Sequence, residues 1–119
     1  MRDWIKKTRE IAELSDYHKP GRRTGALVIK KGKVLSVGFN KMKNRIGVRT
    51  KYKSFTMHAE IDALEKINGK ARGATIIILR QKGGISLPCS NCYAAIFDSG
   101  LRKIIYEDSD KNIIEYIIK

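Results

Sequence analysis

The sequence predicts an α/β domain, and three observations support this fold class. Two apolar segments rich in β-forming residues, 24–29 and 34–39, are joined by a short lysine- and glycine-containing stretch, which is typical of an antiparallel hairpin. Residues 74–79 form a mostly β-branched run, the composition of a strand that is buried on both faces. A helical pattern lies between the hairpin and that strand, so strands and helices alternate along the chain.

The segments on either side of the hairpin follow from hydrophobic periodicity and from turn-forming residues. Residues 3–15 place their apolar side chains near one face, which predicts an amphipathic helix. Residues 15–23 contain proline and glycine and predict a loop. Asn40 ends the second hairpin strand, and residues 41–56 are polar, basic and without periodicity. We expect these residues to form a long loop, a kind of segment that is often functional in a compact domain.

The second half of the chain continues the alternation. Residues 58–67 predict a second helix, whose connection to the strand at 74–79 is a crossover and implies parallel pairing with the hairpin. Residues 90–99 predict a third helix, and 104–106 a further strand. The final segment, 112–118, fits a strand or a short helix. We favour an antiparallel strand, because a parallel return needs a crossover of roughly a dozen residues and too few are present.

Length and composition predict one domain spanning residues 1–119. The chain is 42% hydrophobic and 31% charged, as is ordinary for a globular protein. It contains no apolar run near the ~20 residues that a membrane span requires, so we expect no membrane partner. Residues 1–7 have no apolar stretch typical of a secretory leader, and we expect a cytoplasmic location.

The positive charge is concentrated in one segment, residues 17–59. The chain carries 25 basic and 12 acidic side chains, and residues 17–59 hold twelve of the basic and none of the acidic ones. Such a segment attracts phosphate groups. It contains Tyr52 and Phe55, which could stack on unpaired bases. A solvated lysine-rich face, with the two aromatic rings anchoring the loop, is the alternative interpretation.

Two short motifs carry the chemistry: His58-Ala59-Glu60, and the Pro-Cys-x-x-Cys pattern that contains Pro88, Cys89 and Cys92. One histidine and two cysteines can hold Zn²⁺ at three corners of a tetrahedron and leave the fourth open for water, the arrangement of a catalytic site. Both motifs lie at the starts of predicted helices, where the helix dipole stabilises thiolates. The alternative to a zinc site is a redox-active Cys-x-x-Cys pair, but that interpretation leaves His58 and Glu60 unexplained.

Glu60 is the predicted acid/base residue. A zinc ion held by two thiolates and one imidazole lowers the pKa of its bound water, so that a zinc-bound hydroxide can act as the nucleophile. A carboxylate that does not bind the metal can then take the proton and deliver it to a ring nitrogen and to a leaving amine. An ordinary acidic residue in the first helical turn is the alternative interpretation of Glu60.

The two motifs together resemble the zinc-dependent cytidine/deoxycytidylate deaminase superfamily, which has the signature H-x-E followed by P-C-x-x-C. The resemblance implies a three-layer α-β-α fold with a mixed five-stranded sheet. It also implies hydrolytic deamination of cytosine to uracil, or of adenine to hypoxanthine. By residue matching, His58, Cys89 and Cys92 are the implied zinc ligands and Glu60 the acid/base. The implied substrate contacts are Asn40, Ala59, Ser86 and Pro88.

Our first hypothesis is a deaminase of free cytidine or deoxycytidine nucleosides or nucleotides. An antiparallel last strand supports it, because the tRNA adenosine deaminases and typical deoxycytidylate deaminases are expected to end on a parallel strand. The alternative is a base deaminase acting on single-stranded DNA, RNA or tRNA, which the basic segment 17–59 favours. A zinc-stabilised binding module without activity is a third hypothesis, which the presence of Glu60 disfavours. The resemblance also implies a homo-oligomer.

Overall fold

The computed structural model describes residues 2–17, 20–42, 56–67, 70–88 and 90–118. The elements in this part of the chain are α1 (Arg2–Ala12), the 3-10 helix η1 (Pro20–Arg22), β1 (Thr24–Lys30), β2 (Lys33–Phe39), β3 (Lys41–Met42), β4 (Thr56–Met57), α2 (Ala59–Ile67), β5 (Thr75–Arg80), α3 (Ser90–Asp98), β6 (Lys103–Glu107) and β7 (Ile113–Ile117). None of the helices among these residues has the length and apolar character needed to cross a membrane.

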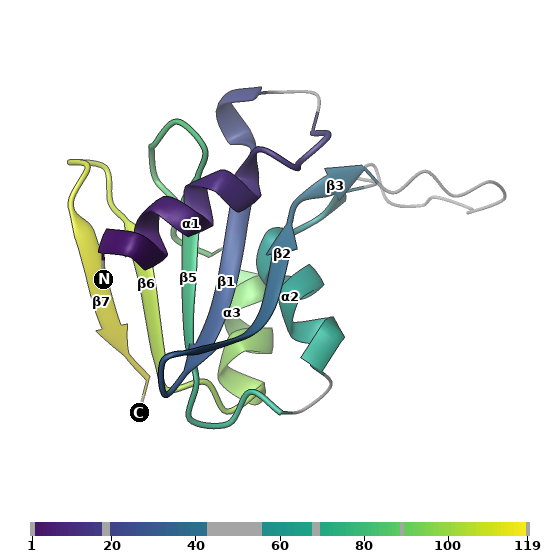
Figure 1. The fold of residues 1–119 in the computed structure, drawn as a ribbon, viewed down its shortest axis with the longest axis vertical. Helices are drawn as coiled ribbons and strands as arrows, with labels where there is room; N and C mark the ends of the chain where they lie inside the picture. The colour runs from purple at the N-terminus through teal and green to yellow at the C-terminus, as the bar shows by residue number, and fades with distance from the viewer. Residues whose placement is uncertain (1, 18–19, 43–55, 68–69, 89, 119) are drawn as a thin grey trace, which may run out of the picture.

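A mixed five-stranded sheet in the order β2-β1-β5-β6-β7 forms the centre of the molecule (Figure 1). Strands β5 and β6 are parallel, and the other neighbouring pairs are antiparallel. The predicted mixed sheet is therefore confirmed. The last segment is the predicted antiparallel strand, with Lys103 opposite Ile117 and Glu107 opposite Ile113.

The predicted parallel pairing of the third strand with the hairpin is wrong. Strand β5 pairs antiparallel with β1, with Thr24 opposite Arg80 and Ile29 opposite Thr75. The crossover through α2 does return the chain in the direction of β2. However, β1 lies between β2 and β5 in the sheet, so β5 has as its neighbour the hairpin strand that runs the other way.

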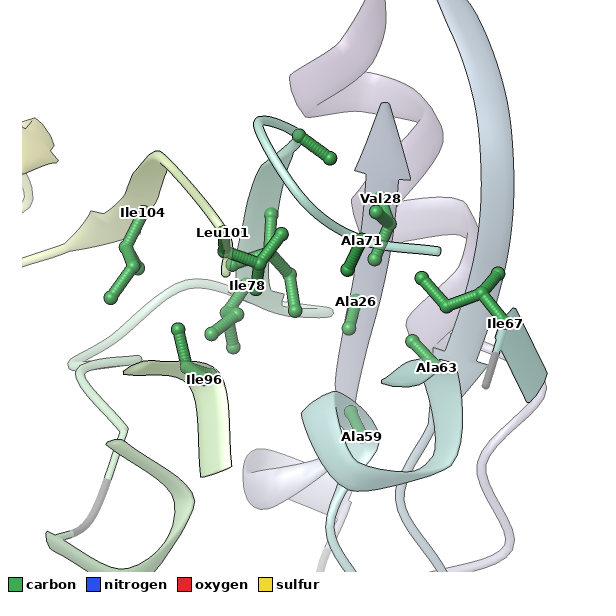
Figure 2. Close-up of a cluster of buried hydrophobic side chains, with 12 residues drawn as sticks. Ala26, Val28, Ala59, Ala63, Ile67, Ala71, Ile78, Ile96, Leu101 and Ile104 are labelled. Atoms are coloured by element: carbon green, nitrogen blue, oxygen red, sulfur yellow. The ribbon is translucent and has the colours of Figure 1, made fainter. Parts of the chain in front are cut away.

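Helices cover both faces of the sheet, which gives the predicted three layers. Helix α1 lies on one face and α2 and α3 on the other (Figure 1). Alternate strand residues point to opposite faces, so Leu27 and Ile77 pack with Ile11 of α1. Val28 and Ile78 pack on the other face. The α-helical residues buried with them are Ala59, Ala63, Ile67 and Ile96 (Figure 2).

The loops around the hairpin differ in how well the sequence predicted them. The turn between β1 and β2 has positive φ angles at Lys31 (52°) and Gly32 (76°), as a tight hairpin turn requires. Residues 41–56 were expected to be loop throughout, but their two ends pair as the antiparallel strands β3 and β4. The predicted stacking role of Tyr52 and Phe55 lies outside the described residues.

Two glycines let helices approach the sheet closely, one on each face. A Cβ at Gly25 would collide with the backbone of Thr8 and Ala12 in α1. A Cβ at Gly38 would collide with the Ala59 carbonyl oxygen and lie 2.5 Å from the Ala63 nitrogen in α2. Since Ala59 adjoins His58 and Glu60, the missing side chain at Gly38 sets the distance between the sheet and the predicted active residues.

The substitution Gly38→Ala is therefore expected to destabilise the fold. The added methyl group meets backbone atoms that cannot rotate away, and overpacking of this kind costs about 1–3 kcal/mol. Urea denaturation measures the loss. Gly21→Ala is the matched control, because a Cβ at Gly21 has no neighbour within 4 Å. Equal stability of the two variants would show that α2 can move away from β2 without cost.

Candidate active site

Helix α2 places His58 and Glu60 at its start. The predicted helix began at His58, but α2 begins at Ala59. His58 therefore lies immediately before the helix and not in its first turn. The carbonyl of His58 accepts a hydrogen bond from the backbone N–H of Asp62 at 3.0 Å. This bond gives His58 the geometry of a helix N-cap residue, while Glu60 belongs to the first turn.

A buried carboxylate, Asp62, fixes the first turn of α2 against the sheet. Its side chain accepts a hydrogen bond from the backbone N–H of Phe39 at 3.3 Å. It also pairs with the ammonium groups of Lys41, at 3.1 Å, and Lys66, at 3.3 Å. Breaking a buried ion pair from one side is costly, so these contacts hold the helix start in position.

The start of α3 brings Cys92 to the same place. Cys92 lies in the first turn of that helix and is 4% exposed. Its Sγ is 3.1 Å from Nδ1 of His58. The possible ligand atoms of His58, Glu60 and Cys92 all lie within 4.8 Å of one another. The two predicted motifs, 34 residues apart at this contact, therefore meet at one point.

The described part of this cluster fits a zinc ion. Imidazole nitrogen and thiolate sulfur are both ligands that zinc prefers. With bonds of about 2.0–2.1 Å to nitrogen and 2.3 Å to sulfur, tetrahedral coordination puts the two atoms roughly 3.5 Å apart. The observed distance of 3.1 Å between Cys92 Sγ and His58 Nδ1 would therefore need to increase only slightly. The third predicted ligand, Cys89, lies outside the described residues.

Glu60 is a buried carboxyl group, 5% exposed. Burial raises its pKa above the usual range, because an apolar environment disfavours the charged form. A hydrogen bond to its own backbone, the charge of His58 and a hydrogen bond with Cys92 act in the opposite direction and are smaller. A carboxyl group with a raised pKa holds a proton more readily than an exposed one, so it can both accept and release a proton, as acid/base catalysis requires.

A pocket of about 310 Å³ opens beside the cluster. It lies where the end of β2, the start of β1, the end of β5 and the start of α2 meet. Of the predicted site residues that the structure describes, His58, Ala59, Glu60, Asn40 and Ser86 line this pocket. Pro88 is buried but is not part of the pocket lining.

Asn40 is held rigidly at the pocket wall. Its Oδ1 accepts hydrogen bonds from the Ser15 hydroxyl, at 2.7 Å, and from the Thr24 N–H, at 2.9 Å. Its Nδ2 donates to the Arg22 carbonyl at 2.9 Å. These bonds orient the amide and leave one of its two N–H donors for a ligand. Asn40, which the family resemblance implied as a substrate contact, therefore also holds the loop before β1 in place.

Ser86 is fixed by β6. Its hydroxyl accepts a hydrogen bond from the backbone N–H of Glu107 at 2.8 Å, and its own N–H donates to the Glu107 carbonyl at 3.0 Å. The Glu107 carboxylate, which is buried, accepts from the N–H of Gly84 at 3.0 Å and pairs with Arg9 at 3.4 Å. This network anchors the pocket-lining loop that precedes the Cys-x-x-Cys motif.

The sequence did not single out the remaining pocket-lining residues. They are Tyr17, Arg22, Thr24, Ile78, Arg80, Ile85 and Leu87. Membership in the basic segment 17–59 was the one signal that pointed to Arg22. Arg80 ends β5, opposite Thr24, and only the register between β1 and β5 shows that it shares a pocket with Arg22. Ile85 and Leu87 are 49% and 55% exposed.

Comparison with known proteins agrees with this site. Residues 1–108 match the family model for the cytidine and deoxycytidylate deaminase zinc-binding region. The riboflavin biosynthesis protein RibD of Aquifex aeolicus is 28% identical over 102 residues, which cover 81% of this chain and 24% of that protein. The chain thus spans about a quarter of the length of this relative.

Two solved structures share the fold. The dCMP deaminase of the cyanophage S-TIM5 aligns with a TM-score of 0.67 and 24% identity, over 91% of this chain and 82% of that one. The cytidine deaminase of Burkholderia pseudomallei aligns with a TM-score of 0.72 and 18% identity, over 98% and 91% of the two chains. Because the family model matches nearly the whole chain, the protein belongs to the cytidine and deoxycytidylate deaminase family and carries its zinc-binding region.

Proposed function

We propose that this protein is a zinc-dependent hydrolytic deaminase that converts cytosine to uracil in a free cytidine or deoxycytidine nucleoside or nucleotide. The observation that carries the proposal is the convergence of His58, Cys92 and the buried Glu60 beside one pocket. Family membership supports the reaction class. The S-TIM5 dCMP deaminase, which was also solved with dCMP and dUMP, supports the substrate class.

Each residue of the cluster has a distinct role in this proposal. His58 and Cys92 hold zinc together with Cys89, and the metal supplies Lewis-acid activation of water. Glu60 accepts a proton from the water whose oxygen adds to C4 of cytosine. It delivers protons to the ring nitrogen and to the amine, the bond from C4 to the amine breaks, and ammonia leaves.

The pocket suits one small substrate. Its volume of about 310 Å³ is at the lower end of the range for small-molecule sites. Polar groups from Asn40, Thr24 and Ser86 line it together with the apolar side chain of Ile78. A flat base packs against an apolar wall while fixed polar groups select its orientation, so this lining supports a single nucleoside or nucleotide as the substrate.

Deamination of a base in single-stranded nucleic acid is the second candidate. The excess of positive charge in residues 17–59 favours it, because such a segment attracts a phosphate backbone. Within this segment, however, Lys41 pairs with Asp62. The likeness to RibD supports a third kind of free substrate, an intermediate of riboflavin biosynthesis. We rank it below cytosine compounds, because the chain spans only 24% of that relative.

Assembly as a homo-oligomer stays a prediction. The side chains of Ile113, Tyr116 and Ile117 on the edge strand β7 are 36%, 47% and 53% exposed. Exposed apolar side chains on an edge strand are compatible with pairing between copies.

A substrate panel tests the proposed function. The zinc-loaded protein is incubated with cytidine, deoxycytidine, dCMP, adenosine and a cytosine-containing single-stranded oligonucleotide, at low and high salt, and ammonia release is measured. We expect release from the free cytosine compounds. Faster release from the oligonucleotide, with a rate that collapses at high salt, would favour the second candidate. Release from adenosine alone would contradict cytosine as the target base.

A further inference from the structure

Two arginines in the pocket lining lack an acidic partner. Arg22 and Arg80 both line the pocket, and Glu60 is the one carboxylate among the lining residues. All twelve acidic side chains of the protein belong to the described residues. The ion pairs in this part of the chain are Arg9–Glu107, Lys41–Asp62, Lys66–Asp62 and Lys103–Glu115. Neither pocket arginine takes part in one.

The fold holds the backbones of both arginines in place. The Arg22 carbonyl accepts hydrogen bonds from the Thr24 hydroxyl, at 3.0 Å, and from the Asn40 amide, at 2.9 Å. The Arg80 carbonyl accepts one from the Arg9 guanidinium at 2.8 Å. Arg80 is also paired in register with Thr24. Two elements that are distant in sequence, η1 and the end of β5, thus each contribute to the pocket lining one arginine whose backbone is anchored.

From this arrangement we infer that the pocket takes a phosphorylated pyrimidine nucleoside, with its phosphate bound by Arg22 and Arg80. The inference rests on the proposed deaminase function and narrows its substrate from nucleosides and nucleotides to nucleotides. A phosphate monoester carries a charge of about −1.5 to −2 at neutral pH, which two guanidinium groups balance. A neutral nucleoside would leave both arginines without an anion.

Electrostatics also orient the substrate. The Glu60 carboxylate repels a phosphate, while the two arginines attract it. The phosphate therefore lies at the arginine side of the pocket, and the base extends toward His58 and Glu60. Half-buried Arg80 gains most from an anionic partner, because an unpaired charge that has lost part of its water is costly. Arginine also binds phosphate oxygens with two parallel hydrogen bonds.

The size of the pocket and the number of its arginines fit one mononucleotide. At about 310 Å³ the pocket is near the smallest size typical of small-molecule sites, and its two arginines match one phosphate group. A single-stranded substrate would instead need a groove of positive charge that follows several phosphates. We therefore assign Arg22 and Arg80 to a single terminal phosphate.

Charge-removing substitutions test this assignment. For Arg22→Gln and for Arg80→Gln, the ratio of kcat/KM for dCMP to that for deoxycytidine should fall about 10- to 100-fold, because each loses a charge-assisted hydrogen bond. The change is expected mainly in KM, since the phosphate lies away from the reacting atoms. Lys82→Gln is the matched control: it removes an exposed charge close to Arg80 that is not part of the pocket lining, and it should leave the ratio unchanged.

A binding measurement separates this inference from the proposed function. Calorimetry compares dUMP with deoxyuridine on the zinc-loaded protein, and we expect dUMP to bind more tightly, with the difference lost in either arginine variant. Absence of all deamination together with this phosphate-dependent binding would overturn the proposed function and support the phosphate site. Equal use of deoxycytidine and dCMP, with equal binding of both products, would overturn the phosphate site alone. An oligonucleotide that is deaminated faster than dCMP would overturn the assignment to a mononucleotide.

Discussion

The substitution Glu60→Gln is expected to lower kcat for deamination about 100- to 10,000-fold, the usual contribution of a positioned acid/base group. Glutamine has the shape of the carboxyl group but cannot carry the proton between water and the leaving amine. Glu60 is buried within hydrogen-bonding reach of Cys92, so the isosteric change preserves packing. Ammonia release measures the loss of activity, and elemental analysis measures the zinc content, which should be retained.

Glu65→Gln is the control for this experiment, because Glu65 lies on the same helix, α2, and is exposed. It should keep both activity and zinc. Unchanged turnover in Glu60→Gln would refute the role of Glu60 as the proton carrier. Loss of zinc from that variant would indicate that Glu60 is itself a metal ligand, since its carboxylate lies within 4.8 Å of the possible ligand atoms of His58 and Cys92.

The second large effect is expected for Cys92→Ser, which should lose zinc, activity and much of the thermal stability. Serine replaces a thiolate by a hydroxyl that zinc binds weakly. The side chain at this position is 4% exposed and contacts His58. Zinc binding to structural sites is worth about 10–16 kcal/mol. Even part of this binding free energy is as large as the free energy of unfolding of a typical domain, about 5–15 kcal/mol.

Zinc content and the melting temperature, with and without a chelator, measure this effect. The chelator should lower the melting temperature of the unsubstituted protein and leave that of Cys92→Ser unchanged. Phe97→Ser is the control: it introduces the same residue into the same helix, α3, at a side chain that is 52% exposed, and it should retain zinc. Normal zinc content in Cys92→Ser would contradict the assignment of Cys92 as a ligand.

The chemistry of the site was the most predictable part of the protein. His58, Glu60 and Cys92 belong to two short motifs whose residue types are rare in combination, so their meeting could be expected before the fold was known. Strand positions were also predictable, because β-branched runs such as residues 74–79 are local signals. The structure confirms both the strand and the cluster.

Pairing between distant strands was less predictable. A crossover connection indicates that two strands run in the same direction, but not that they are neighbours. Here β1 lies between β2 and β5, so the expected parallel pairing was wrong. The order of the strands in the sheet depends on how the apolar faces of β1 and β5 pack with α1 and α2. This packing is a property of the assembled core.

The reaction class of this protein was readable from local sequence, because the predicted zinc ligands and the predicted acid/base residue belong to motifs that are recognised by residue type and spacing. The identity of the other side chains in the pocket depends instead on long-range packing. Arg22 and Arg80 are 58 residues apart in the chain and belong to no common motif. They share a pocket because β1 and β5 pair in a register that sets Thr24 opposite Arg80, and long-range register depends on burial across the whole sheet.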